Sequence, residues 1–329
     1  MANRAINDPL FDLVSHARHG PGRRDHLTPA QVQQIARTAG RTPEVMVKVL
    51  PRGANDLGAV ERHLDYIDRE GEVELETDDG QTLAGRRIGK DLLEDWDLEL
   101  DARRGRMDLA PRPGRPAPRL VHKLIFSMPA GTPPDKVLKA VQNFCREEFA
   151  LKHRYAMALH TDEPHPHVHV VMKAVSEQGE RLHIRKATLR QWREGFARHL
   201  RALGVPANAT QRYVRGETSP RKSDGIYRAS LRGDSTHMRE RAEAVARDLV
   251  RGNVRAEPGK AKLMETRDSV RRAWWAVSEI LIRDKQPDLA AQVRRFAEQM
   301  PPPMTEREWL AGQLAERIRP PRAREEPSR

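Results

Sequence analysis

The stretch RYAMALHTDEPHPHVHVVMKA, residues 154–174, decides how the middle of this chain folds. Its two ends, 154–160 and 167–174, are apolar segments of strand length, and a polar loop separates them. Segments with this spacing pair most simply as an antiparallel hairpin. Four histidines fall within ten positions of the hairpin, at His160, His165, His167 and His169. This density of imidazoles indicates a ligand.

Metal binding is the chemistry that such a histidine cluster favours. Side chains alternate faces along a strand, so His165, His167 and His169 are expected on one side of the second strand. His160 ends the first strand and can reach across the hairpin toward His167 and His169. Three neutral imidazoles from neighbouring strands make a metal site with open coordination positions. The alternatives are a loop that binds nothing and a structural metal clip, although a structural zinc site usually recruits cysteine and none lies here.

The sequence on either side of the hairpin extends the same architecture. Its periodicity gives the order strand, helix, insert, strand, helix, hairpin, helix, and the elements outside the hairpin are expected over 43–51, 58–71, 119–132, 134–150 and 188–203. We therefore expect an α+β fold in which an antiparallel sheet carries helices on one face. The insert, about residues 77–118, joins the acidic run Asp91–Asp101 to a segment rich in Pro and Arg. Such a composition is typical of a disordered bridging segment.

Composition divides the chain into three regions. A helical N-terminal extension over 1–40, with Thr28 as a helix cap, precedes the main domain over 41–216. A basic, partly helical region over 217–329 follows. The formal charge of +12 favours a polyanionic partner such as nucleic acid, whereas the plain alternative is a soluble basic surface.

Several protein classes are disfavoured by what the sequence lacks. Its apolar runs are far too short for a membrane span, and the first forty residues lack the apolar centre of a secretory signal. Cys145 is the single cysteine, so no internal disulfide can form and a reducing cytoplasm fits. Since no phosphate-loop signature occurs, we expect no built-in helicase motor.

A second motif, ERHLDYIDREGEVEL over Glu61–Leu75, places Tyr66 in a helix near Arg62, His63 and Arg69. A free phenol is a poor nucleophile at neutral pH because it is mostly protonated. Nearby cations or a hydrogen-bonded base would favour the phenoxide. Taken alone, this helix favours a structural tyrosine, and only the histidine cluster makes a nucleophile the better interpretation.

Three motifs together resemble those of the conjugative relaxases, the tyrosine mobilization nucleases of the HUH endonuclease class. The branch that contains the T-DNA border endonuclease is especially similar. HLDYIDREGEVEL resembles the first family motif, whose tyrosine is the nucleophile, and HKLIFSMPAGT resembles the second, with Ser127 in place. HTDEPHPHVH resembles the third, the histidine motif. The resemblance covers roughly Pro43–Gly216.

Carried over residue by residue, the resemblance implies a complete catalytic set. Tyr66 would attack a DNA phosphodiester at a transfer origin and retain the 5′-phosphate, while His160, His167 and His169 hold a divalent metal, Mg²⁺ or Mn²⁺ in use. The remaining assignments are catalytic roles for His63 and Asp162, and DNA contacts for Arg62, Arg69, Ser127, His165 and Lys173. Lys173 departs from the family pattern, in which an asparagine is common at that position.

The resemblance also implies partners and rivals. We expect single-stranded or supercoiled origin DNA, relaxosome accessory proteins and a type IV coupling ATPase as partners of a cytoplasmic bacterial protein that can be translocated to a recipient cell with DNA. In a rolling-circle replication initiator, the nearest rival, the nucleophilic tyrosine follows the histidine motif, whereas the helix over 188–203 contains no tyrosine. An inactive DNA-binding accessory protein and a hydrolase of small phosphate esters are the remaining alternatives. Tyr66 and the three histidines argue against the first of these.

Overall fold

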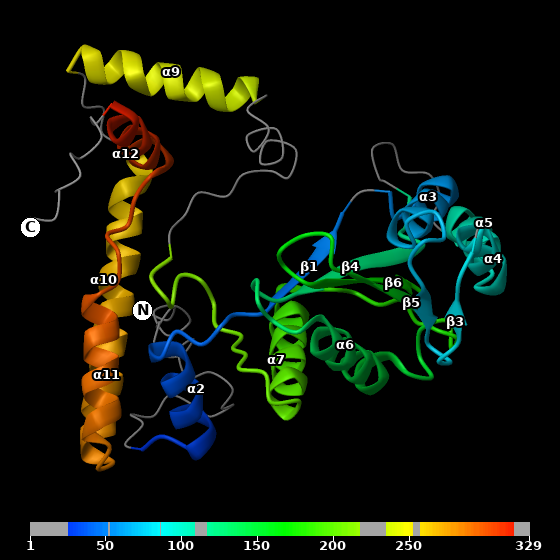
Figure 1. The fold of residues 1–329 in the computed structure, drawn as a ribbon, viewed down its shortest axis with the longest axis horizontal. Coiled ribbons are helices and arrows are strands. Elements are labelled where there is room, and N and C mark those ends of the chain that lie inside the picture. Colours follow the sequence, from blue (N-terminus) through cyan, green and yellow to red (C-terminus); the bar gives the residue numbers. More distant parts are fainter. Residues whose placement is uncertain are drawn as a thin grey trace, which may run out of the picture. The chain divides into compact units, whose positions relative to one another are not determined.

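The computed structural model describes residues 26–51, 53–85, 87–108, 117–217, 235–252 and 257–318 (Figure 1). The chain divides into two compact units. One unit is Arg41–Ala209, and the other combines Met1–Gly40 with Thr210–Arg329. None of the helices in the described ranges has both the length and the apolar character that a membrane span requires.

A six-stranded antiparallel sheet forms the centre of the Arg41–Ala209 unit, with the strand order β1-β4-β6-β5-β2-β3. Its strands are β1 Met46–Leu50, β2 Leu75–Thr77, β3 Thr82–Leu83, β4 Val121–Ser127, β5 Tyr155–His160 and β6 His167–Lys173. The predicted hairpin is β5–β6, in which His160 pairs with His167. The α+β class with an antiparallel sheet and helical extensions is therefore confirmed.

Two helices, α6 (Pro134–Phe149) and α7 (Lys186–Ala202), cover one face of the sheet (Figure 1). The buried side of α6 carries apolar residues at helical spacing, among them Val137, Val141 and Phe144. They meet the inward side chains of alternate strand positions, such as Phe126, whose ring centroid lies 5.2 Å from that of Phe144 and 5.3 Å from that of Phe196. This core holds the central strands in register.

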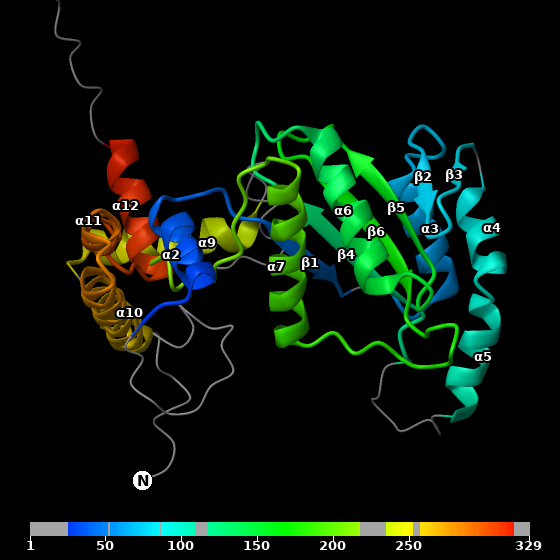
Figure 2. The same ribbon diagram turned by 90° about the horizontal axis from the view of Figure 1, so that it is seen from below.

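The opposite face of the sheet also carries helices, which corrects the expectation of helices on one face. They are α3 (Leu57–Ile67), α4 (Ile88–Asp95) and α5 (Leu98–Asp108), and Figure 2 shows them on the other side of the sheet from α7. Val121, Ala156 and Val171 point from the strands into this second core.

The insert over 77–118 is consequently not a disordered bridge in its described part. Within the acidic run, Leu92, Leu93, Trp96 and Leu98 are buried against α3 and the sheet, while every acidic residue of the run except Asp101 is exposed. The many acidic residues obscured the amphipathic pattern of this segment. In the sequence alone, such a segment resembles a solvated one. Residues 109–116, the Pro/Arg-rich part, lie outside the described residues.

The second unit joins both ends of the chain in one core. It contains α2 (Pro29–Ala39), α9 (Thr236–Val250), α10 (Pro258–Arg283), α11 (Pro287–Glu298) and α12 (Glu306–Ile318). Ile35 of α2 is buried with Trp274 of α10 and Val293 of α11. The Trp274 indole Nε1 donates a 2.9 Å hydrogen bond to the carbonyl oxygen of Val214, so the segment after residue 209 packs here as well. The division into functional domains at residues 40 and 216 stays a prediction.

Candidate metal centre

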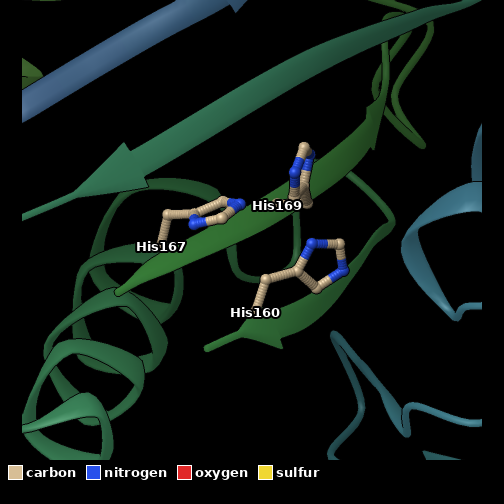
Figure 3. Close-up of side chains that lie close together, drawn as sticks. All are labelled: His160, His167 and His169. Atoms are coloured by element: carbon tan, nitrogen blue, oxygen red, sulfur yellow. The ribbon is translucent and has the colours of Figure 1, made fainter. Parts of the chain in front are cut away.

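The β5–β6 hairpin brings three histidines together on one face of the sheet. His160 lies opposite His167, and His169 lies two residues further along β6 on the same face. Figure 3 shows the three imidazoles gathered between the two strands. One ring nitrogen of each histidine lies within 4.8 Å of those of the other two. The hairpin register alone therefore brings together three side chains that could hold a metal ion.

Each of the three rings has a nitrogen that can offer a lone pair, although the His160 Nδ1 also lies 3.3 Å from Arg69 Nη2. The His160 Nε2 lies 2.7 Å from the carbonyl oxygen of Ile67, and the His167 Nδ1 lies 3.0 Å from the carbonyl oxygen of His165. A carbonyl accepts a hydrogen bond from a protonated ring nitrogen, which fixes the tautomer and leaves the other nitrogen with a lone pair. The His169 Nδ1 is buried without a hydrogen-bond partner among the described residues. Such an orphaned nitrogen fits a metal ligand.

The electrostatics of the triad favour neutral imidazoles. Burial lowers the pKa of His169 to about 2, with further lowering by the neighbouring His160 and His167. Burial also lowers the pKa of His160. Neutral imidazole is the form that binds a metal. Three nitrogen donors suit transition metals better than Mg²⁺, which prefers oxygen ligands, so the choice between Mg²⁺ and Mn²⁺ stays a prediction.

Helix α3 is firmly seated beside this triad. Its N-cap Asp56 accepts a 2.8 Å hydrogen bond from the backbone N–H of Ala59, and Val60, Leu64 and Ile67 are fully buried. The carbonyl of Ile67, at the last turn, is the acceptor for His160 described above. The C-terminal end of α3 is thereby tied directly to the candidate metal ligands.

Tyr66 occupies the exposed side of that last turn. Its side chain is 45% exposed, and its ring centroid lies 5.9 Å from that of His169 and 6.3 Å from that of His160. His63 stacks on Tyr66 with 5.9 Å between the ring centroids. Burial lowers the pKa of His63 to about 4, assisted by the charge of Lys123 and by His160. A neutral imidazole and an accessible phenol therefore lie side by side at the triad.

The turn after α3 directs Arg69 back over the site. Arg69 has a φ of 54°, in the left-handed region that non-glycine residues rarely adopt and that often marks functional sites. Its Cζ lies 4.9 Å from the ring centroid of Tyr66, and its Nη2 lies 2.5 Å from Asp162 Oδ2 and 3.3 Å from His160 Nδ1. Asp162 therefore pairs with Arg69 in this structure, and its catalytic role stays a prediction.

The residues predicted to contact DNA fall into different environments. The Arg62 side chain is 75% exposed on α3. His165 lies in the exposed loop before β6, so its expected place beside His167 and His169 on the strand is wrong, because β6 begins only at His167. Ser127 is buried at the end of β4, opposite His167.

Lys173 is also buried, and acidic groups surround its ammonium. Its Nζ lies 3.3 Å from Glu177 Oε1 and 3.8 Å from Asp101 Oδ2. This ion pairing within the fold removes the reason to assign Lys173 to DNA. Sequence reasoning missed a second buried lysine, Lys123, on the same face of the sheet. The alternation in HKLIFS could have found it, since Leu124 and Phe126 belong to the opposite core.

One family match accompanies this geometry. Residues 75–205 match the family described as Relaxase: MobA/VirD2-like, nuclease domain. The matched range contains all three histidines and Lys123, and it begins after Tyr66. No curated protein matches the chain at a significant level.

Proposed function

The chain carries a MobA/VirD2-like relaxase nuclease domain over residues 75–205, and from that premise we propose that Tyr66 opens one DNA strand at a transfer origin by transesterification. The observation that carries this proposal is the position of Tyr66, exposed and in ring contact with both His160 and His169. A nuclease of this family acts on DNA, and an exposed phenol beside three potential metal ligands supports covalent rather than hydrolytic cleavage.

The proposed reaction exchanges one phosphate ester for another. The Tyr66 oxygen forms a bond to the scissile phosphorus, and the bond from phosphorus to the 3′-oxygen breaks. His63, stacked on Tyr66 and neutral because of its lowered pKa, is the nearest candidate to accept the phenolic proton. The 3′-oxygen leaves as a hydroxyl after taking up a proton. Since the number of phosphodiester bonds is unchanged, the 3′-hydroxyl can attack the phosphotyrosine and reseal the strand.

His160, His167 and His169 would hold the divalent metal of this reaction. When bound, the ion supplies charge stabilisation to the non-bridging phosphate oxygens. Arg69 adds a second positive group at the same place, because its guanidinium lies over the Tyr66 ring. Its pairing with Asp162 keeps the guanidinium there, so we assign Asp162 a positioning role.

We place the DNA strand along the face of the sheet that carries the three histidines. Met46 at the start of β1 is 48% exposed, and the Arg62 side chain on α3 is 75% exposed. A scissile phosphate can reach Tyr66 only when its strand leaves the duplex, so single-stranded or supercoiled origin DNA is the proposed substrate. Accessory proteins, a coupling ATPase, a cytoplasmic location and transfer of the protein with its DNA are proposals that rest on the family alone.

A rolling-circle replication initiator is supported less well. That reading needs a nucleophilic tyrosine on the helix after the histidines, and α7 contains none. The four tyrosines of the chain are Tyr66, Tyr155, Tyr213 and Tyr227. Among the three that lie in the described ranges, Tyr155 is 3% exposed in the opposite core, Tyr213 packs in the helical unit, and Tyr66 lies beside the triad.

Substitution of Tyr66 by Phe tests the proposal. Tyr66→Phe should still bind origin DNA but give no covalent adduct on a denaturing gel, because the attacking oxygen is missing. Tyr213→Phe is the matched control, since Tyr213 packs in the helical unit, and it should form adduct at the wild-type rate. An adduct that survives in Tyr66→Phe would move the nucleophile elsewhere.

A further inference from the structure

Lys123 is a buried lysine that the fold leaves without a counter-ion. It is 6% exposed, and burial lowers its pKa. Among the described residues, no carboxylate pairs with its ammonium, and no hydrogen-bond acceptor binds it. Lys173, 7% exposed on the same face of neighbouring β6, has both Glu177 and Asp101 as partners. A buried charge without a partner destabilises the folded state. An anion from outside the chain would therefore stabilise the Lys123 ammonium.

A glycine lies directly beside the Lys123 ammonium. The Lys123 Nζ lies at the turn before α3, where a Cβ added to Gly53 would come within 3.3 Å of it. Gly53 has a φ of 66°, and that Cβ would also lie 3.0 Å from the Cβ of Ala59. Glycine therefore satisfies the backbone at this turn and keeps a side chain away from the ammonium. On its other side the ammonium acts electrostatically on His63.

Lys123 also lies at a defined distance from the histidine triad. On β4, Ile125 pairs with His169, and Lys123 is two residues further along on the same face. Two residues of extended strand span about 7 Å. The backbone of Lys123 is therefore offset along the strand from the histidine opposite which Tyr66 lies. This offset suits a neighbouring phosphate of the same DNA strand.

We propose that Lys123 binds a backbone phosphate adjacent to the scissile one, so that the strand lies between the triad and the turn at Gly53. The inference rests on the proposed function, since that function supplies the polyanion. The DNA phosphate completes an ion pair that the folded protein lacks. Lys123 thereby fixes the register of the strand relative to Tyr66, and it takes no part in bond breaking.

Neutral phosphate analogues test this proposal in the full chain. In the Tyr66→Phe background, single-stranded origin oligonucleotides with one methylphosphonate at each successive position are titrated against the protein. One position next to the scissile linkage should weaken binding by about tenfold. Lys123→Met should show the same loss with unmodified DNA and no further loss with that analogue. Lys173→Met, the matched buried lysine, should keep the full effect of the analogue.

Two further readouts separate this inference from a structural role of Lys123. The slope of log affinity against log salt should fall by about 0.7 in Lys123→Met, the value of one phosphate contact on a single strand. Without DNA, Lys123→Met should melt at a higher temperature than the parent, whereas Lys173→Met should melt at a lower one. A lower melting temperature for Lys123→Met, or an analogue pattern unchanged by it, would overturn the proposal.

The proposed function can fail independently of this inference. If the wild-type chain forms no adduct on DNA that it binds, the transesterification is wrong. The analogue scan in the Tyr66→Phe background still reports whether Lys123 holds a phosphate.

Discussion

Replacing Asp162 by Asn separates two roles that a carboxylate beside a nucleophile can play. Asp162 Oδ2 lies 2.5 Å from Arg69 Nη2, and the side chains are 55% and 29% exposed. An ion pair this open to solvent contributes about 0.5–1 kcal/mol. If Asp162 only holds Arg69 over the Tyr66 ring, its loss costs no more than that energy. A loss of this size corresponds to a two- to fivefold slower cleavage.

A general base would behave very differently. Loss of a positioned proton acceptor lowers the rate by about 10²–10⁴-fold and changes the pH profile. The assay is single-turnover cleavage of an end-labelled origin oligonucleotide with Mn²⁺, at several pH values, by Asp162→Asn. Glu163→Gln, a neighbouring exposed carboxylate, serves as the control and should match wild type. A hundredfold loss in Asp162→Asn would refute the positioning role.

Further predictions concern the metal, pH and the two units. His167→Ala should lose cleavage together with bound metal, measured by elemental analysis, and full nicking by chelator-treated wild type would exclude metal dependence. The pKa of His122, 5% exposed, falls from 6.5 to about 4 because of burial, so the unfolded state binds more protons between these values. His122 should therefore contribute a loss of up to about 3 kcal/mol in stability between pH 6.5 and pH 4, and His122→Gln should reduce the slope in urea titrations by this part. Residues 41–209 alone should still nick origin DNA but not support transfer between cells; lost nicking would place the helical unit inside the catalytic fold. Deleting 1–40 should lower the melting temperature of the helical unit, because Ile35 leaves the core around Trp274; an unchanged melting temperature would contradict this packing.

Local periodicity carried most of the fold prediction. The hairpin over 154–174, the strand at β4 and helices α6 and α7 all follow from apolar spacing and end signals in the sequence. The same reasoning missed α4 and α5, since the acidic residues around Trp96 outweighed its apolar neighbours. It also could not find the partner of α2, because Ile35 meets Trp274 more than two hundred positions away.

Part of the candidate site could likewise be predicted from the sequence, and part of it could not. Three histidines at strand spacing are visible in the sequence, and their register follows from the hairpin. The partners of charged residues are not visible, because they depend on long-range packing. Lys173 pairs with Asp101, which lies in the segment that we expected to be disordered. Lys123 has no such partner among the described residues. This difference between the two lysines is visible only in the folded chain.

Covalent mapping tests the central claim most directly. Wild-type protein is incubated with a single-stranded origin oligonucleotide and Mn²⁺, digested with protease and nuclease, and analysed by tandem mass spectrometry. We expect a nucleotide joined through its 5′-phosphate to Tyr66, and an unmodified Tyr66 peptide in metal-free samples. A modified residue other than Tyr66, or cleaved DNA with a free 5′-phosphate and no peptide adduct, would contradict it.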